Sequence, residues 1–289
     1  MQKQKKTVAI GGIALSIAMI CGVFMAAKSP SAAQAESTCE VQTCAAEQLY
    51  DGYCGMGELT DTYTETINYD HKETVSVEIP YGLPFYSSTQ YDDACTPIAG
   101  TVLIGYFDRF CENLVPNYKT YTQFGSRVIY RSMGTQMQGV LSDLYSLMGT
   151  NSGGTGTTFN GFNSGMSAYA SQHGYTYSWS NVWSSSLSSY GAAIESGKPV
   201  AVFLMGFSLV SAESTSAGKD VFTISEYTGN HVVASYGYKI DYYYDSADNL
   251  ITSRTYLTVI NGGYLNSSIK YICLNGRSNV AYAISTWIE

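Results

Sequence analysis

Hydrophobic positions along the chain change their spacing near residue 197. Before it, four segments show helical spacing of apolar residues or helix-ending glycines, which predicts helices. After it, segments rich in β-branched and aromatic residues predict strands. The sequence therefore predicts an α+β fold with a helical N-terminal half and a sheet-rich second half. The predicted helices span residues 96–110, 134–148, 162–174 and 184–197, and the predicted strands span residues 198–207, 230–244, 253–262, 269–276 and 280–288.

Residues 36–80 show no sustained periodic pattern. This stretch is acidic, and only residues 75–80 alternate like a short strand. We expect an N-terminal extension or propeptide over residues 36–80, followed by one domain over residues 81–289.

The first 35 residues have the pattern of a secretory signal peptide. Lysines at positions 3, 5 and 6 precede a long uncharged run, and Ala33-Gln34-Ala35 forms a cleavage site. Glycines and a serine interrupt the apolar run, which favours cleavage over a permanent membrane anchor. We therefore expect a secreted, extracellular protein with no membrane span after signal cleavage.

The charge and the motif content exclude several function classes. The formal net charge is −8, and it becomes −12 when the four lysines of the signal peptide are removed. An acidic surface repels nucleic acid and anionic membranes, so neither is an expected partner. The chain has no phosphate-binding glycine loop with its lysine, no serine-hydrolase elbow and no metal-ligand spacing. We expect no cofactor and no metal, and the oligomeric state is open.

Six cysteines remain after export, and Cys95 has a special position among them. It stands directly before the predicted helix 96–110. Three interpretations of Cys95 are open: a buried small residue, a disulfide partner or a nucleophile. For Cys111 and Cys273, at apolar positions of a helix and a strand, we expect core packing. The pairing of the other three cysteines is open.

A cysteine nucleophile needs an imidazole base, a group that orients the imidazole, and donors for the oxyanion. His231, at the start of a predicted strand, lies 136 residues after Cys95, and Asn261 follows 30 residues later. This order and the first spacing match those of papain-type peptidases. Gln90 and the Cys95 backbone N–H are the expected oxyanion donors. The helix N-terminus and a nearby imidazolium favour the thiolate.

Three segments resemble those of bacterial secreted C39-like peptidases, which have a papain-like fold. Residues 90–110 (QYDDACTPIAGTVLIGYFDRF) resemble the nucleophile segment, residues 229–238 (GNHVVASYGY) the histidine segment, and residues 256–263 (YLTVINGG) the segment of the third catalytic residue. The resemblance implies a two-lobed fold in which the nucleophile helix packs against an antiparallel sheet. It also implies a thiol protease that hydrolyses peptide or protein substrates through a Cys-His-Asn triad.

Two other functions stay open. Asp92 and Asp93, either of which can cap the helix, oppose thiolate formation by like-charge repulsion. Together with 26 tyrosines, they fit a catalytically inactive papain-like binding or adhesion protein. The same triad also serves acyl transfer of the transglutaminase-like type. Taken singly, His231 is also consistent with a hydrogen-bonded strand residue, Asn261 with a turn residue, and Gln90 with a loop residue.

Overall fold

The computed structural model describes residues 57–131, 134–154, 156–184, 186–262 and 270–289. The described residues all belong to one compact unit of the chain. The predicted signal peptide and three of the six cysteines that follow it lie outside the described residues. Within the described part, no helix combines the length and the apolar character needed to cross a bilayer.

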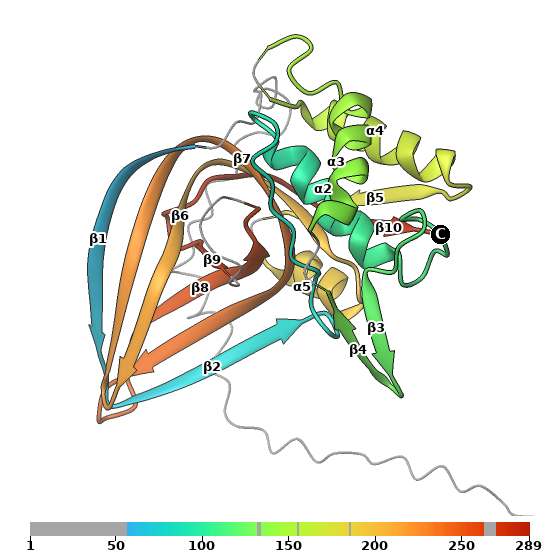
Figure 1. The fold of residues 1–289 in the computed structure, drawn as a ribbon. Coiled ribbons are helices and arrows are strands. Elements are labelled where there is room, and N and C mark those ends of the chain that lie inside the picture. Colours follow the sequence, from blue (N-terminus) through green and yellow to red (C-terminus); the bar gives the residue numbers. More distant parts are fainter. Residues whose placement is uncertain (1–56, 132–133, 155, 185, 263–269) are drawn as a thin grey trace, which may run out of the picture. The chain divides into compact units, whose positions relative to one another are not determined.

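The described residues form mostly strands, with four α-helices and one short 3-10 turn (Figure 1). The helical elements are α2 (Cys95–Phe107), η1 (Thr135–Met137), α3 (Gln138–Leu147), α4 (Phe159–Gln172) and α5 (Ser188–Glu195). The strands are β1 (Glu58–Asn68), β2 (His71–Glu78), β3 (Tyr121–Phe124), β4 (Arg127–Tyr130), β5 (Tyr177–Asn181), β6 (Val200–Ser216), β7 (Lys219–Tyr244), β8 (Leu250–Ile260), β9 (Lys270–Cys273) and β10 (Val280–Ile288).

Strand β7 organises a large antiparallel sheet of eight strands. Its first half pairs with β1 and β6, and its second half pairs with β2 and β8. Because β9 pairs with both β6 and β8, the pairings of β6, β7, β8 and β9 close a ring. Strands β10 and β5 continue the sheet beyond β6, and β3 and β4 form a separate hairpin.

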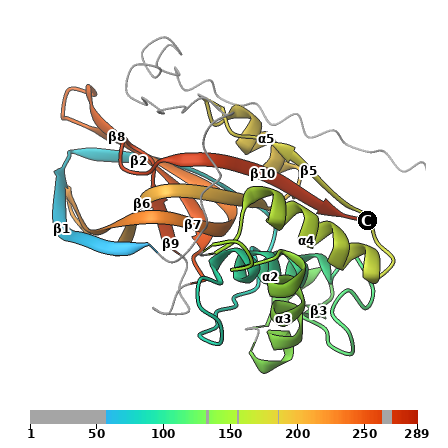
Figure 2. The same cartoon turned by 90° about the horizontal axis from the view of Figure 1, so that it is seen from above.

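Helix α2 lies in the main core, and all 13 of its residues are buried. It contacts β7, α3 and α4, whereas α5 contacts β2, β6, β7 and β10. Figure 2 shows α5 on the opposite face of the sheet from α2, α3 and α4. A helix without a polar face packs in the interior. Cys95, the first residue of α2, therefore lies inside the fold.

The predictions for the helices and for the strands after residue 197 are confirmed. Each predicted helix overlaps one of α2 to α5, with ends that differ by a few residues. Two strands are longer than predicted, because β6 continues to Ser216 and β7 already begins at Lys219. The additional residues pair with each other and with β1.

The expected helical N-terminal half is wrong, and with it the papain-like two-lobed α+β fold. Strands make up 44% and helices 22% of the described residues. Strands β1 to β4 all precede residue 131, and β1 and β2 belong to the large sheet. The alternation at residues 75–80 indicates only the end of β2, and no pattern indicates β1, because the part-buried positions of these strands include the charged residues Glu65 and Lys72.

Glu65 and Lys72 form ion pairs with residues far along the chain. Lys72 Nζ lies 2.7 Å from Asp220 Oδ2 and 3.4 Å from Asp241 Oδ2. Both aspartates are fully buried. Glu65 Oε2 lies 3.2 Å from Nη2 of Arg277. These partners make a charged, part-buried residue compatible with a strand of this sheet.

Replacing Lys72 with methionine should lower the free energy of unfolding by about 3 kcal/mol, because a buried carboxylate loses its cation. Lys239 Nζ still lies 3.1 Å from Asp241, so Asp220 is the carboxylate most affected. Denaturant unfolding measures the change. Lys219→Met, at the exposed start of β7, is the control, and equal free energies of unfolding for the two variants would contradict the prediction.

Candidate active site

Cys95 begins helix α2 and is 4% exposed. Ala94 occupies the N-cap position without a side-chain hydrogen bond, so the expected capping by Asp92 or Asp93 does not occur. Asp93 instead adopts a left-handed backbone with a φ of 55°, which aspartate tolerates better than most residues. The first N–H groups of a helix have no acceptor within it. The thiol therefore lies at the positive end of a buried helix.

His231 and Asn261 meet where β8 ends. His231 lies inside β7 rather than at its start, and it is 2% exposed. Asn261 directly follows β8. Nε2 of His231 lies 2.9 Å from Oδ1 of Asn261 and 3.2 Å from the backbone oxygen of the same residue. Because both oxygens are acceptors, Nε2 carries the proton and donates it. Nδ1 is then the basic nitrogen of the neutral ring.

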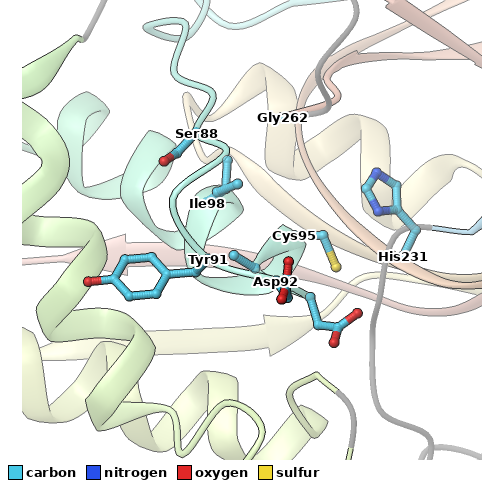
Figure 3. Close-up of a pocket in the computed structure, with 9 residues that line it drawn as sticks. Ser88, Tyr91, Asp92, Cys95, Ile98, His231 and Gly262 are labelled. Atoms are coloured by element: carbon cyan, nitrogen blue, oxygen red, sulfur yellow. The ribbon is translucent and has the colours of Figure 1, made fainter.

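Cys95 and His231 lie side by side at the wall of the same cavity (Figure 3). No oxygen or nitrogen of the described chain bonds to Nδ1 of His231, which leaves this nitrogen to the thiol. Burial lowers the pKa of His231, but the Cys95 thiol and the hydrogen bonds to Asn261 raise it more, so that the pKa lies above its ordinary value. The arrangement favours an imidazolium beside a thiolate.

The thiol and the imidazole line a cavity of about 390 Å³ (Figure 3). This volume falls in the range of sites that bind small molecules or single side chains. The wall combines residues of the loop before α2, the first turns of α2, β7 and the end of β8. The lining residues are Ser88, Tyr91, Asp92, Asp93, Ala94, Cys95, Ile98, His231 and Gly262.

Gln90 is not among the residues that line this cavity. It is exposed, and its side-chain amide donates to the Tyr91 hydroxyl at 3.3 Å. Its backbone N–H donates to Oγ of Ser88 at 3.1 Å. Cys95, His231 and Asn261 thus converge, whereas Gln90 points elsewhere. The N–H groups at the start of α2 remain as donors for a negatively charged oxygen.

Cys111 and Cys273 are buried thiols outside any disulfide, which confirms core packing for both. Burial raises the pKa of the Cys111 thiol, and it raises the pKa of Cys273 to about 11. A thiol that stays protonated is a poor nucleophile. Among the three cysteines that the structure describes, Cys95 is the one that shares a cavity with a histidine.

Gly262 holds the segment of Asn261 against α2. Its φ is +67°, and a Cβ at this position would lie 2.8 Å from Cγ2 of Ile98. Gly262→Ala should therefore displace Asn261 and lower the rate of Cys95 alkylation at pH 6 about tenfold. Gly125→Ala, at a φ of +59° with nothing within 4 Å, is the control. Equal alkylation rates of the two variants would contradict this prediction.

Phe207 and Tyr227 form an aromatic stack on His231 that no sequence pattern indicates. The Phe207 ring lies 5.0 Å from the imidazole at an angle of 18°, and the Tyr227 ring lies 4.8 Å from Phe207 at 8°. Phe207 faces Tyr227 across the β6–β7 pair and is buried. A stacked ring restricts the orientation of the imidazole, and its π face stabilises an imidazolium.

Phe207→Leu should lower the pKa of His231 by about 0.5, because the imidazolium loses the aromatic face. NMR titration of the His231 ring measures this pKa without reference to any activity. Phe222→Leu is the control, since Phe222 is also buried but packs beside Tyr256 at 6.2 Å. An unchanged pKa in Phe207→Leu would show that the stack does not stabilise the charged ring.

A comparison with models of protein families finds no match for the chain, and a comparison with curated proteins finds none either. The candidate site therefore rests on the geometry of Cys95, His231 and Asn261.

Proposed function

We propose that the chain is a secreted cysteine peptidase that hydrolyses peptide bonds in peptide or protein substrates. The observation that carries this proposal is the arrangement of His231: Asn261 binds Nε2, and Nδ1 is left for the Cys95 thiol. Covalent acyl chemistry needs a nucleophile, a base that faces it, and a third group that orients the base. The local resemblance of three segments to C39-like peptidases supports the activity, and the pattern of residues 1–35 supports export.

The reaction has two steps in this proposal. The Cys95 thiolate attacks the scissile carbonyl, and the imidazolium of His231 gives its proton to the amine, which leaves as the C–N bond breaks. Water then attacks the thioester while His231 takes its proton, and the acid leaves as the C–S bond breaks and the Cys95 thiolate beside the His231 imidazolium is restored. Asn261 keeps Nε2 protonated throughout. The N–H groups at the start of α2 stabilise the negative oxygen of each tetrahedral intermediate.

Cleavage of casein and of a fluorogenic peptide mixture under reducing conditions tests the proposal. The protein should cleave both, and a thiol-directed peptidyl epoxide should label Cys95 and stop the cleavage. If neither cleavage nor labelling is seen, the chain is not a cysteine peptidase. An added primary amine separates hydrolysis from acyl transfer, because a transferase forms the amide of that amine.

A further inference from the structure

Two aspartates border the cavity beside the candidate nucleophile. Asp92 and Asp93 line the same cavity as Cys95 and His231, and Asp92 is labelled beside Cys95 in Figure 3. Burial and the charges of Cys95 and Asp92 raise the pKa of Asp93, against a smaller opposite effect of a hydrogen bond from Asn151. A Cys95 thiolate therefore adds a third negative group to a small volume.

Among the described residues, no lysine, arginine or histidine side chain forms an ion pair with Asp92 or Asp93. The ion pairs among the described residues involve other acids, such as Asp220, which binds Lys72 at 2.7 Å. The neutral Asn151 is the neighbour of the acidic pair, and its Nδ2 lies 3.5 Å from the backbone oxygen of Asp92. The His231 imidazolium balances the Cys95 thiolate, and the negative charge of the two aspartates is left without a cation in the wall of the cavity.

His231 supplies a second feature that points to a ligand. Its side chain is 2% exposed and lines the cavity, and its Nδ1 has no oxygen or nitrogen partner in the described chain. A buried base aligned with a nucleophile is arranged to meet a reacting group. The two aspartates therefore lie beside the place where a substrate would be bound.

We propose that this cavity selects peptides with a lysine or arginine side chain next to the scissile bond, and that Asp92 and Asp93 bind its cationic group. This inference rests on the proposed peptidase function and names its substrate class. Carboxylates form strong, charge-assisted hydrogen bonds with ammonium and guanidinium groups. The bound cation also offsets the repulsion between the thiolate and the two acids. The net charge of −8 favours the approach of cationic peptides.

Modification of Cys95 tests the charge preference without any turnover. Two methanethiosulfonate reagents of similar size, one with a trimethylammonium group and one with a sulfonate, react with the protein, and peptide mass spectrometry follows Cys95. The rate of each reagent with Cys95 is divided by its rate with a small free thiol. At low ionic strength, this normalised rate should be about tenfold higher for the cationic reagent than for the anionic one. The preference should disappear in the double variant Asp92→Asn/Asp93→Asn.

Asp248→Asn is the matched control. Asp248 also has a positive φ, 62° against 55° for Asp93, so both positions place the same demand on an asparagine backbone. It lies exposed in the turn between β7 and β8, and its substitution should leave the preference intact. Asp92→Asn alone should reduce the preference for the cationic reagent. Because Asp92 is exposed, this single variant keeps the test decisive if the double variant does not fold. The cation site would be overturned if the wild type showed no preference for the cationic reagent. It would also be overturned if the preference survived in Asp92→Asn/Asp93→Asn.

Peptide cleavage then separates this inference from the proposed function. Three fluorogenic peptides differ only in lysine, norleucine or glutamate beside the scissile bond. Lysine should give a kcat/KM about tenfold above that of norleucine, and the double variant should lose this difference. Cleavage that depends on Cys95 but not on charge would overturn the cation site and leave the peptidase standing. A reagent preference without cleavage of any peptide would overturn the peptidase instead.

Discussion

Replacing Cys95 with alanine is expected to lower kcat/KM for peptide cleavage by at least about a thousandfold, because the acyl-enzyme forms on its sulfur. The hydrogen bond between His231 and Asn261 does not involve the thiol, so the base and its orienting group should stay in place. Labelling by the peptidyl epoxide should disappear at the same time. Steady-state kinetics and mass spectrometry of the labelled protein measure the two effects.

Cys111→Ala is the matched control for this substitution. Cys111 is a buried thiol as well, at 2% exposure, and it donates to the backbone oxygen of Ile288 at 3.4 Å. The control variant should keep both cleavage and labelling. If Cys95→Ala still cleaves peptides at the rate of Cys111→Ala, another residue is the nucleophile.

Alkylation of Cys95 by iodoacetamide at pH 6 is expected to fall about a hundredfold when His231 is replaced with alanine. An ordinary thiol, with a pKa of about 8.5, is less than about 1% thiolate at this pH. A thiolate that is paired with an imidazolium is the major form instead. His173→Ala is the control, because His173 packs on Tyr169 at the end of α4. Equal rates in the two variants would contradict the role of His231.

The protonation of His231 sets the upper end of the pH range over which peptides are cleaved. Burial lowers the pKa of His231, but Cys95 and Asn261 raise it more, and the result lies above its ordinary value. The imidazolium is present below this raised pKa and is lost as the pH rises through it, and the leaving amine then has no proton donor. The pH profile of kcat/KM should therefore fall at a pH above about 6.5, the ordinary value of histidine. A fall centred below that pH would contradict the raised pKa.

Local patterns in the sequence indicate Cys95, His231 and Asn261 because each stands at a feature that neighbouring residues define. Cys95 precedes a helix whose apolar spacing is evident over four turns. His231 and Asn261 belong to segments rich in β-branched and aromatic residues, next to glycines. The residue types then suggest the chemistry, and the structure brings the three side chains together.

Gln90 and Phe207 show where such patterns stop being informative. Gln90 is five residues from Cys95, but the intervening chain contains the left-handed Asp93, and no residue spacing predicts that turn. Phe207 touches His231 only because β6 and β7 pair in a register that stacks the two rings. A side-chain direction in a loop and a contact across strands both depend on the packed structure.

By itself, the sequence determined the four helices, the strand-rich region after residue 197 and the three residues that converge, since these follow from local periodicity and residue type. Only the tertiary structure decided that β1 and β2 belong to the sheet and that the fold is mostly β. Glu65 and Lys72 occupy part-buried positions there, next to Arg277 and Asp220 from 212 and 148 residues away. The spacing of neighbouring residues carries no information about such distant partners, and without them a part-buried charge is unfavourable in a strand.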